Sequence, residues 1–298
     1  MSSNSSNNNA MEFALLALLA LLWGSSYLFI KIAVTDIPPL TLIAVRVTIA
    51  ALVLLVIMLW HDEKLPRDHT TWRLLFVQAF FTSTGAWTLL AWGQQKIDSG
   101  LASVLNSTSP IFVFFFTLLV TRHETVSWLK FIGGCLGLSG VVMIVGVDVL
   151  HGVGHQVTGQ LAALGGAILY ACAAIYGRRF SAMEPVTVAT GTMLCATACL
   201  VPLSLIIDRP WTLTPSTQSV LAALFLAVFC TGIALQIYFR LINTLGSMGV
   251  ASQAYLRAGV GVLLGMIFLG EQFTLIIGFG LAAAILGVAA INLPFGRR

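Results

Sequence analysis

Residues 23–31 read Trp-Gly-Ser-Ser-Tyr-Leu-Phe-Ile-Lys, and residues 170–178 read Tyr-Ala-Cys-Ala-Ala-Ile-Tyr-Gly-Arg. Each stretch is apolar, begins with an aromatic residue and ends with a base, and the two start 147 positions apart. The same spacing relates further identical residues: Pro38 and Pro185, Glu124 and Glu271, Gly133 and Gly280, Gly140 and Gly287. The chain is therefore predicted to contain two copies of one structural unit.

The amino-acid composition distinguishes a membrane protein from a water-soluble one. Of the 298 residues, 58% are hydrophobic and 9% are charged, whereas about a quarter of a soluble domain is charged. We therefore expect an all-α integral membrane protein that contacts the lipid bilayer. The net charge of +4 comes with no basic run interleaved with aromatic residues, so nucleic acid is not an expected partner.

Ten apolar stretches are long enough to cross a hydrocarbon core of about 30 Å as helices. They are 12–34, 39–60, 72–95, 101–121, 127–147, 159–180, 185–207, 217–240, 248–269 and 273–293. These are continuous apolar runs, which favour helices over the alternating pattern of a β-barrel. Residues 1–11 are rich in Ser and Asn and are predicted to be a disordered tail. The two repeats are predicted to span 12–148 and 159–294, and an odd number of spans in each inverts the second relative to the first.

The distribution of bases predicts the orientation. With both termini in the cytoplasm, the inner side or its helix ends hold ten bases and the outer side holds Lys31, Lys96 and Arg209. The inner ten are Lys64, Arg67, Arg73, Arg122, Lys130, Arg178, Arg179, Arg240, Arg297 and Arg298. This asymmetry follows the positive-inside rule.

Several local motifs accompany the repeat. They are the Trp-Gly-Ser-Ser stretch ending at Lys31, Pro-Leu-Thr at 39–41 followed by Arg46, the pair Ser109 and Pro110, Glu124 and Glu271 after spans 4 and 9, and glycine-rich spans 5 and 10. Together they resemble the drug/metabolite transporter superfamily, in particular its EamA-type ten-helix bacterial exporters. The resemblance covers nearly the whole chain. It implies alternating-access efflux of small metabolites such as amino acids, across the bacterial inner (plasma) membrane.

The resemblance also implies a central cavity lined mainly by spans 1 to 4 and 6 to 9, with spans 5 and 10 packed peripherally. One departure concerns span 9. Many relatives have Glu-Pro-Val there, whereas this chain has Arg257, Ala258, Gly259 and Val260. The role of the relatives' carboxylate therefore cannot be assigned to this position, where the chain has a base, Arg257, nearby.

The ionisable residues bear on mechanism. All eleven acids and five histidines fall at predicted helix ends or in loops. Proton-coupled carriers usually keep a titratable group inside the membrane, so we expect transport without an intramembrane protonatable carboxylate. The five cysteines lack paired ligand spacing, so we expect neither a metal site nor a cofactor. No catalytic residues are predicted, and a membrane-embedded enzyme is the least favoured function.

Two arginines are predicted inside the membrane. Arg257 lies near the midplane, where its planar guanidinium suits the carboxylate of a substrate. A structural role, snorkelling or bonding helix-end carbonyls, is the less favoured alternative for it. Arg46 lies about a third of the way in from the outer face, and a structural role bonding helix-end carbonyls is an equal alternative for it. Other candidates for substrate binding are Trp23, Gln78, Trp87, Asn106, Tyr170 and Tyr255. Trp23 and Tyr170 are repeat mates that could sandwich an apolar side chain, although core packing explains them equally well.

Prolines interrupt two spans. Pro110 and Pro202 each remove a backbone donor, so both are candidates for gating kinks, with a static kink as the alternative. The favoured function is export of small metabolites, most of all amino acids, including aromatic or other apolar ones. An exporter of lipophilic cations is the alternative, because aromatic cages bind such cations. The sequence leaves the oligomeric state open.

Overall fold

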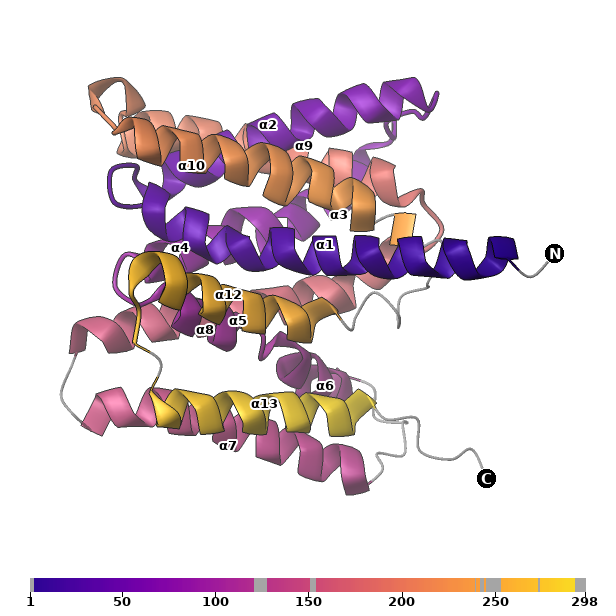
Figure 1. Cartoon of the computed structure of the whole chain (residues 1–298). Helices are drawn as coiled ribbons and strands as arrows, with labels where there is room; N and C mark the ends of the chain where they lie inside the picture. Colours follow the sequence, from indigo (N-terminus) through magenta and orange to yellow (C-terminus); the bar gives the residue numbers. More distant parts are fainter. Residues whose placement is uncertain are drawn as a thin grey trace.

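The computed structural model describes residues 3–120, 128–150, 154–238, 240–241, 244, 253–272 and 274–292, and its secondary structure in these segments is helical (Figure 1). The α-helices are α1 (Ser3–Ala33), α2 (Pro39–Trp60), α3 (His69–Ala79), α4 (Thr88–Gln94), α5 (Ser99–Asn106), α6 (Ser109–Val120), α7 (Trp128–Leu150), α8 (Gly154–Gly177), α9 (Pro185–Ile207), α10 (Thr217–Ala227), α12 (Gln253–Leu269) and α13 (Leu275–Asn292). Seven stretches are long and apolar enough to cross a membrane, and three shorter apolar helices accompany them. The all-α membrane fold predicted from the sequence is confirmed.

The first helix includes part of the segment that the sequence predicts to be a disordered tail. α1 begins at Ser3, so the helix includes most of residues 1–11. Ser and Asn are poor helix formers, but adding a residue to an existing helix is far easier than starting a new one. The long apolar part of α1 therefore extends the helix into the polar segment.

Turn chemistry sets several helix starts. Pro39 and Pro185 occupy the first turns of α2 and α9, where the missing N–H leaves no hydrogen bond unmade. Asp68 caps α3 by accepting a hydrogen bond from the Thr71 backbone N–H at 2.7 Å. Ser216 caps α10 in the same way, accepting from the Ser219 N–H at 3.3 Å. These caps satisfy donors that have no partner within the helix.

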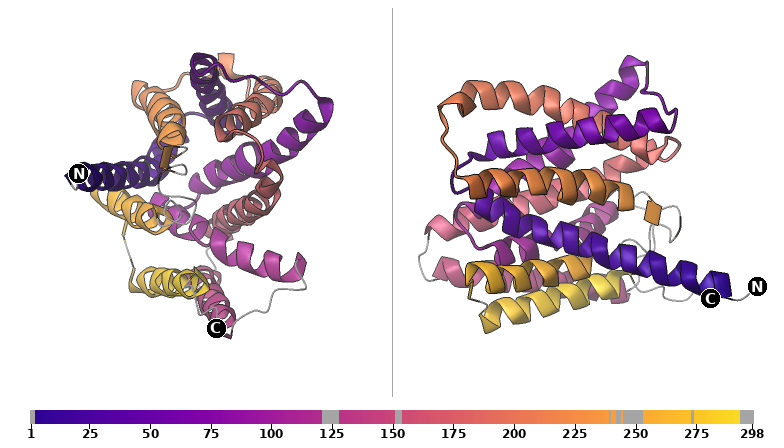
Figure 2. Two further views of the ribbon diagram at one scale, coloured as in Figure 1. Left: turned by 90° about the vertical axis from the view of Figure 1, so that its right-hand side faces the viewer. Right: turned by 45° about the horizontal axis from the view of Figure 1, so that its top comes forward.

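The helices pack in repeat-related pairs. α2 packs on its mate α9, and α7 packs on its mate α13. α1 contacts α12, and the mate of α1, α8, makes the equivalent contact with α5 and α6. The two five-span repeats are thus interleaved around the centre, with α7 and α13 set apart at one edge (Figure 2). This is the inverted-repeat architecture expected from the two copies in the sequence.

α7 and α13 approach closely through glycine. A Cβ added to Gly287 would lie 2.5 Å from the Gly133 carbonyl oxygen, and one added to Gly140 would lie 2.6 Å from that of Gly280. The small residues predicted on these helices therefore serve packing within the chain. Large apolar side chains face outward both on α13, as at Phe279, and on other helices, as at Ile206 in α9, as expected for a surface that contacts lipid.

Two spans contain π-helical segments. η1 (Phe80–Trp87) joins α3 to α4, and η4 (Val228–Ile233) continues α10, whose span runs on to Tyr238. These spans are repeat mates, and the dipeptide Thr-Gly occurs in both segments, at 84–85 and 231–232. A π-helical turn rotates the residues that follow it, and such turns often occur at functional sites.

A central cavity between the repeats

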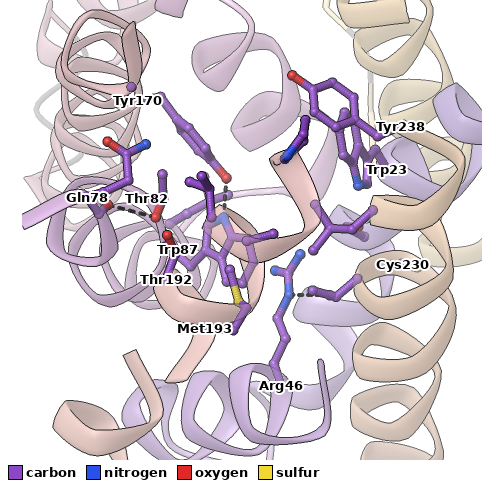
Figure 3. Close-up of a pocket in the computed structure, with 18 of the residues that line it drawn as sticks. Trp23, Arg46, Gln78, Thr82, Trp87, Tyr170, Thr192, Met193, Cys230 and Tyr238 are labelled. Carbon is purple, nitrogen blue, oxygen red and sulfur yellow. Dashed lines mark hydrogen bonds between the residues drawn. The ribbon is translucent and has the colours of Figure 1, made fainter. Parts of the chain in front are cut away.

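A cavity of about 560 Å³ lies at the centre of the bundle (Figure 3). Its described lining comes from α1, α2, spans 3 and 4, α8, α9, span 8 and α12, and none of it comes from α7 or α13. The implied division between lining and peripheral spans is therefore confirmed for these residues. The lining extends from Ile30 and Leu90, toward the face opposite the start of α1, to Phe180 and Pro185 at the face where α1 starts. We call these the far face and the near face.

Six of the predicted binding residues meet in this cavity. They are Trp23, Gln78, Trp87, Asn106, Tyr170 and Arg257. Tyr255 lies in α12 two residues before Arg257, but its side chain falls outside the described part of the chain. The two prolines are not among the lining residues. The repeat, together with buried polar and aromatic residues in the spans, was thus a good guide to which residues surround the cavity.

Arg46 is held in a fixed position at the cavity wall. Only 5% of the residue is exposed, and its Nε donates a hydrogen bond to Thr231 Oγ1 at 2.9 Å. Its guanidinium carbon lies 3.8 Å from the centre of the Trp87 ring. Trp87 in turn donates its indole N–H to the Tyr170 hydroxyl. Figure 3 shows Arg46 between Trp87 and Cys230, with its guanidinium directed toward the space below Tyr170 and Trp23.

The predicted pairing of Trp23 with Tyr170 is replaced by two separate contacts. Trp23 packs on Tyr238, with ring centroids 5.2 Å apart and planes inclined by 44°. Tyr170 instead bonds Trp87. The two repeat mates lie on different sides of the cavity, and Arg46 lies below both in the view of Figure 3. The aromatic walls exist, but each is built from neighbours that the repeat alone does not identify.

Polar atoms complete the lining. Asn106 Nδ2 donates to the Tyr27 hydroxyl at 2.7 Å, and Gln78 Nε2 donates to the Ala173 carbonyl at 3.3 Å. The remaining oxygen of each amide is buried and has no partner among the described residues, and the same holds for Thr192 Oγ1 and the Nε of Arg257. Buried polar atoms without partners are rare in folded proteins. Four such atoms in the lining of one cavity leave it able to bond a polar ligand.

Comparison with known proteins agrees with this geometry. The model of the EamA-like transporter family matches residues 11–146 and again residues 157–293. The chain belongs to the EamA-like transporter family. It is 30% identical to the inner membrane transporter YedA of Escherichia coli (strain K12), over 94% of this chain and 90% of YedA. It is also 24% identical to the transporter YoaV of Bacillus subtilis (strain 168), over 93% of this chain and 95% of YoaV.

A solved crystal structure shares the fold of this EamA-like transporter. The TM-score is 0.65 at 20% sequence identity, and the match covers 97% of this chain and 99% of the other. The chain is thus a membrane transporter of the EamA type with two interleaved repeats. The cavity between the repeats is the natural place for a small molecule.

The cavity of this EamA-like transporter is also lined by residues that the sequence analysis did not propose for binding. They include Tyr27, Thr192, Cys230, Thr231 and Tyr238, together with Arg46 as part of the site. Two signals were available in the sequence. Tyr27 lies one helical turn after Trp23 and so shares its face. Thr231 and Gly232 repeat Thr84 and Gly85 at the spacing of the two copies.

Polar contacts join helix ends at the far face of the transporter. Thr41 donates its backbone N–H and its hydroxyl to Asp208 Oδ2, each at 2.8 Å. Glu271 accepts hydrogen bonds from the N–H groups of Ser99 at 2.6 Å and Gly100 at 2.9 Å. Lys31 Nζ donates to two carbonyl oxygens, 2.8 Å away at Gln94 and 2.7 Å away at Ile97.

Asp36 makes a further contact at the far face, between the end of α1 and the start of α10. It accepts hydrogen bonds from the Ser216 and Ser219 hydroxyls and from the Ser216 N–H. These bonds, first those of the two hydroxyls, hold the pKa of the Asp36 carboxyl below its ordinary value. At the near face, an ion pair of 3.0 Å joins Arg240 to Glu12 across the same two spans.

The proline positions differ in their effect on the helices. Span 4 is broken at residues 107–108, and Pro110 occupies the first turn of α6 immediately after the break. α9 continues through Pro202 to Ile207 without interruption. The break beside Asn106 places Pro110 next to the cavity wall, whereas Pro202 is exposed on the outer surface of its helix.

Proposed function

We propose that this transporter exports small metabolites that carry a carboxylate, amino acids with aromatic or apolar side chains among them, by alternating access. The observation that carries the proposal is the unopposed guanidinium of Arg46 in a cavity walled by aromatic rings. A guanidinium binds a carboxylate with two parallel hydrogen bonds. With Nε bonded to Thr231, the two Nη groups remain for such a ligand.

The size and walls of the cavity support a metabolite of this kind. Its volume of about 560 Å³ lies within the roughly 300–1,000 Å³ of small-molecule sites. Trp23 and Tyr238 form one aromatic wall, and Trp87 and Tyr170 form another. An apolar side chain lying between these walls would place its carboxylate near Arg46 or Arg257.

We propose that transport does not depend on protonation of a carboxylate in the cavity. Among the described lining residues there is no Asp, Glu or His. We propose that substrate moves down its own gradient, from the cytoplasm to the outside of a bacterial plasma membrane. The contacts at the far face, and a lining that reaches the near face, support a conformation in which the cavity opens toward the near face.

Export of lipophilic cations is the rival function. Aromatic rings alone can bind quaternary ammonium groups by cation–π attraction, and this cavity is rich in such rings. Arg46 already occupies the face of Trp87, however, and two guanidinium groups would repel a cationic ligand. An enzymatic role is less favoured still, because both repeats match a transporter family.

Purified protein in lipid vesicles tests the proposal. Vesicles preloaded with unlabelled phenylalanine, leucine or methionine should take up the labelled compound by exchange, with no imposed pH difference. A quaternary ammonium dye should not exchange. Exchange of the dye but of none of the three amino acids or their deaminated carboxylates would contradict the proposal.

The orientation is part of the same proposal. With both termini in the cytoplasm, the exposed 3-10 turn Pro210–Thr212 lies outside the cell. A cysteine at Trp211, in a chain whose five native cysteines are replaced by alanine, should react with an impermeant maleimide added to intact cells. A cysteine at Trp60, which is 86% exposed at the near face, should be protected until the cells are opened. Protection at position 211 together with labelling at position 60 would show that both termini lie outside the cell.

A further inference from the structure

We infer that the cavity selects organic anions that lack an ammonium group, in preference to zwitterionic amino acids. The inference rests on the proposed function, because it concerns the ligand of the same site. Its basis is the charge of the described lining, where Arg46 and Arg257 are the ionised side chains and no acid accompanies them.

Neither arginine has its charge compensated by the described residues. Arg46 makes one hydrogen bond, to the neutral hydroxyl of Thr231, and stacks on Trp87. The Nε of Arg257 is buried and has no partner. The ion pair within the described ranges joins Arg240 to Glu12 at the near face and includes neither of these groups. A buried charge without a counter-ion is costly, so the site gains from any ligand that brings negative charge.

The two arginines act on the same space. Both line the cavity that Tyr170 also lines, so the two positive charges border one space. Arg46 stacks on Trp87, and Trp87 donates its indole N–H to the Tyr170 hydroxyl. A carboxylate bound there meets one arginine directly and is attracted by the second through a poorly polarisable interior, where such forces are weakly screened.

The charge balance separates the ligand classes. The described lining carries a formal charge of +2 from its two arginines. A zwitterion leaves that total unchanged and adds an ammonium, for which the described lining offers no carboxylate. An anion without an ammonium reduces the total, and a dianion cancels it. The unpartnered oxygens of Gln78 and Asn106 are neutral and buried, so they do not replace a carboxylate as the partner of an ammonium.

The walls define the rest of the ligand. Aromatic rings at Trp23, Tyr27, Tyr170 and Tyr238 surround the space that the arginines leave open. The class that fits is a carboxylate or dicarboxylate with an apolar or aromatic body, such as an aryl-alkanoate or a 2-oxo acid. Arg46 is the better-organised of the two anchors, since Thr231 and Trp87 fix its side chain before any ligand arrives.

A three-compound series tests this selection. Phenylalanine, 3-phenylpropanoate and phenethylamine share one body, and the second and third each lack one charged group of the first. Calorimetric titration of the full-length protein in lipid nanodiscs should show 3-phenylpropanoate binding at least tenfold more tightly than phenylalanine. Phenethylamine should not bind measurably.

Variants assign the preference to the arginines. Arg46→Gln and Arg257→Gln should each reduce the ratio between 3-phenylpropanoate and phenylalanine severalfold. Arg46→Lys should retain more of that ratio than Arg46→Gln, because the charge remains. Arg73→Gln removes an exposed base at the near face and serves as the matched control, with an unchanged ratio. Each variant is titrated only if it elutes as the wild-type protein does, and the wild-type ratio stands as a test without them.

The outcomes separate this inference from the proposed function. Phenylalanine binding as tightly as 3-phenylpropanoate would overturn the inference while leaving carboxylate export in place. Phenethylamine binding most tightly would overturn both. Failure of all three compounds to bind would overturn the assignment of an aromatic-bodied anion, and exchange of other carboxylates in vesicles would still support the proposed function.

Discussion

Thr231 shows how a single neutral side chain can organise a charge. Its hydroxyl accepts from Arg46 Nε at 2.9 Å and donates to the Leu226 carbonyl at 2.9 Å, five residues earlier. Thr231 thereby fixes the arginine to the backbone of span 8, and it acts on the substrate only through Arg46.

Replacing Thr231 by Val keeps the shape and removes the acceptor. A hydrogen bond to a charged group is worth about 1.5–3 kcal/mol, so we expect the KM for carboxylate substrates to rise roughly tenfold or more. Thr231→Ser retains the hydroxyl and should behave nearly as wild type. An unchanged KM in Thr231→Val, with normal expression and elution, would show that Arg46 is positioned by its stacking on Trp87 alone.

The sequence pointed to six of the residues that line the cavity, but not to their partners. Trp23, Trp87, Asn106 and Tyr170 were expected from their depth in the membrane, and all line the cavity. Which ring meets which depends on the rotation of each helix about its axis. Local periodicity does not determine that rotation in spans that are apolar on every side. The role of Arg46 was left open for the same reason.

At the scale of helices, the two π-helical segments are the main features that hydropathy could not show. Span 3 was predicted as one helix over 72–95, whereas the structure has α3, η1 and α4 in sequence. The paired Thr-Gly dipeptides were a visible signal. Gly85 has no space for a side chain. A Cβ there would lie 2.7 Å from the Phe80 carbonyl oxygen and 2.8 Å from the Leu169 side chain.

Alanine at Gly85 should therefore destabilise the protein. Overpacking of this kind costs about 1–3 kcal/mol, so the midpoint of thermal unfolding in detergent should fall by several degrees. Gly259→Ala is the matched control, since a Cβ at Gly259 meets no atom of the part of the chain that the structure describes within 4 Å. Gly232→Ala should be intermediate, because its Cβ would lie 3.1 Å from the side chain of Val53, a tighter contact than usual but a looser one than at Gly85. Equal midpoints for Gly85→Ala and Gly259→Ala would show that η1 relaxes without cost.

For the whole molecule, the alternating access that we propose requires that contacts at the far face be breakable. Hydrogen bonds to carboxylates join the ends of spans 1 and 8, 2 and 7, and 4 and 9. Each pair brings together helices from different repeats. Apolar packing of the same ends would be harder to hydrate, whereas polar contacts can be exchanged for water at little net cost.

The contact at Asp36 makes one part of this closure dependent on pH. Because its pKa is lowered in the folded protein, the carboxylate stabilises the fold above the ordinary Asp pKa of about 4, and this contribution is lost as the pH falls through the lower folded value. The thermal midpoint of wild type should therefore exceed that of Asp36→Ala at neutral pH. The gap should shrink below about pH 4. A gap that stays constant from pH 7 to pH 3 would show that the hydrogen bonds of Asp36 do not depend on its charge.

Glu271 provides the sharpest test of how the far face opens. Its carboxylate binds the N–H groups of Ser99 and Gly100 at the start of α5, so it connects the end of α12 to span 4. Its repeat mate Glu124 lies outside the described residues. Losing charge-assisted hydrogen bonds of about 1.5–3 kcal/mol would favour states that lack this contact by roughly ten- to a hundredfold.

We expect Glu271→Ala to expose the far end of the cavity. A cysteine at Ile30, which is 1% exposed and lines that end, should react severalfold faster with an impermeant maleimide applied from the far face. The chain used would again have its native cysteines replaced. Glu184→Ala is the matched control, because that exposed acid precedes α9 at the near face and makes no side-chain capping bond. If the cysteine reacts at the same rate in both variants, Glu271 is a cap for α5 only, and the far face must be held closed by the contacts of Asp36 and Asp208.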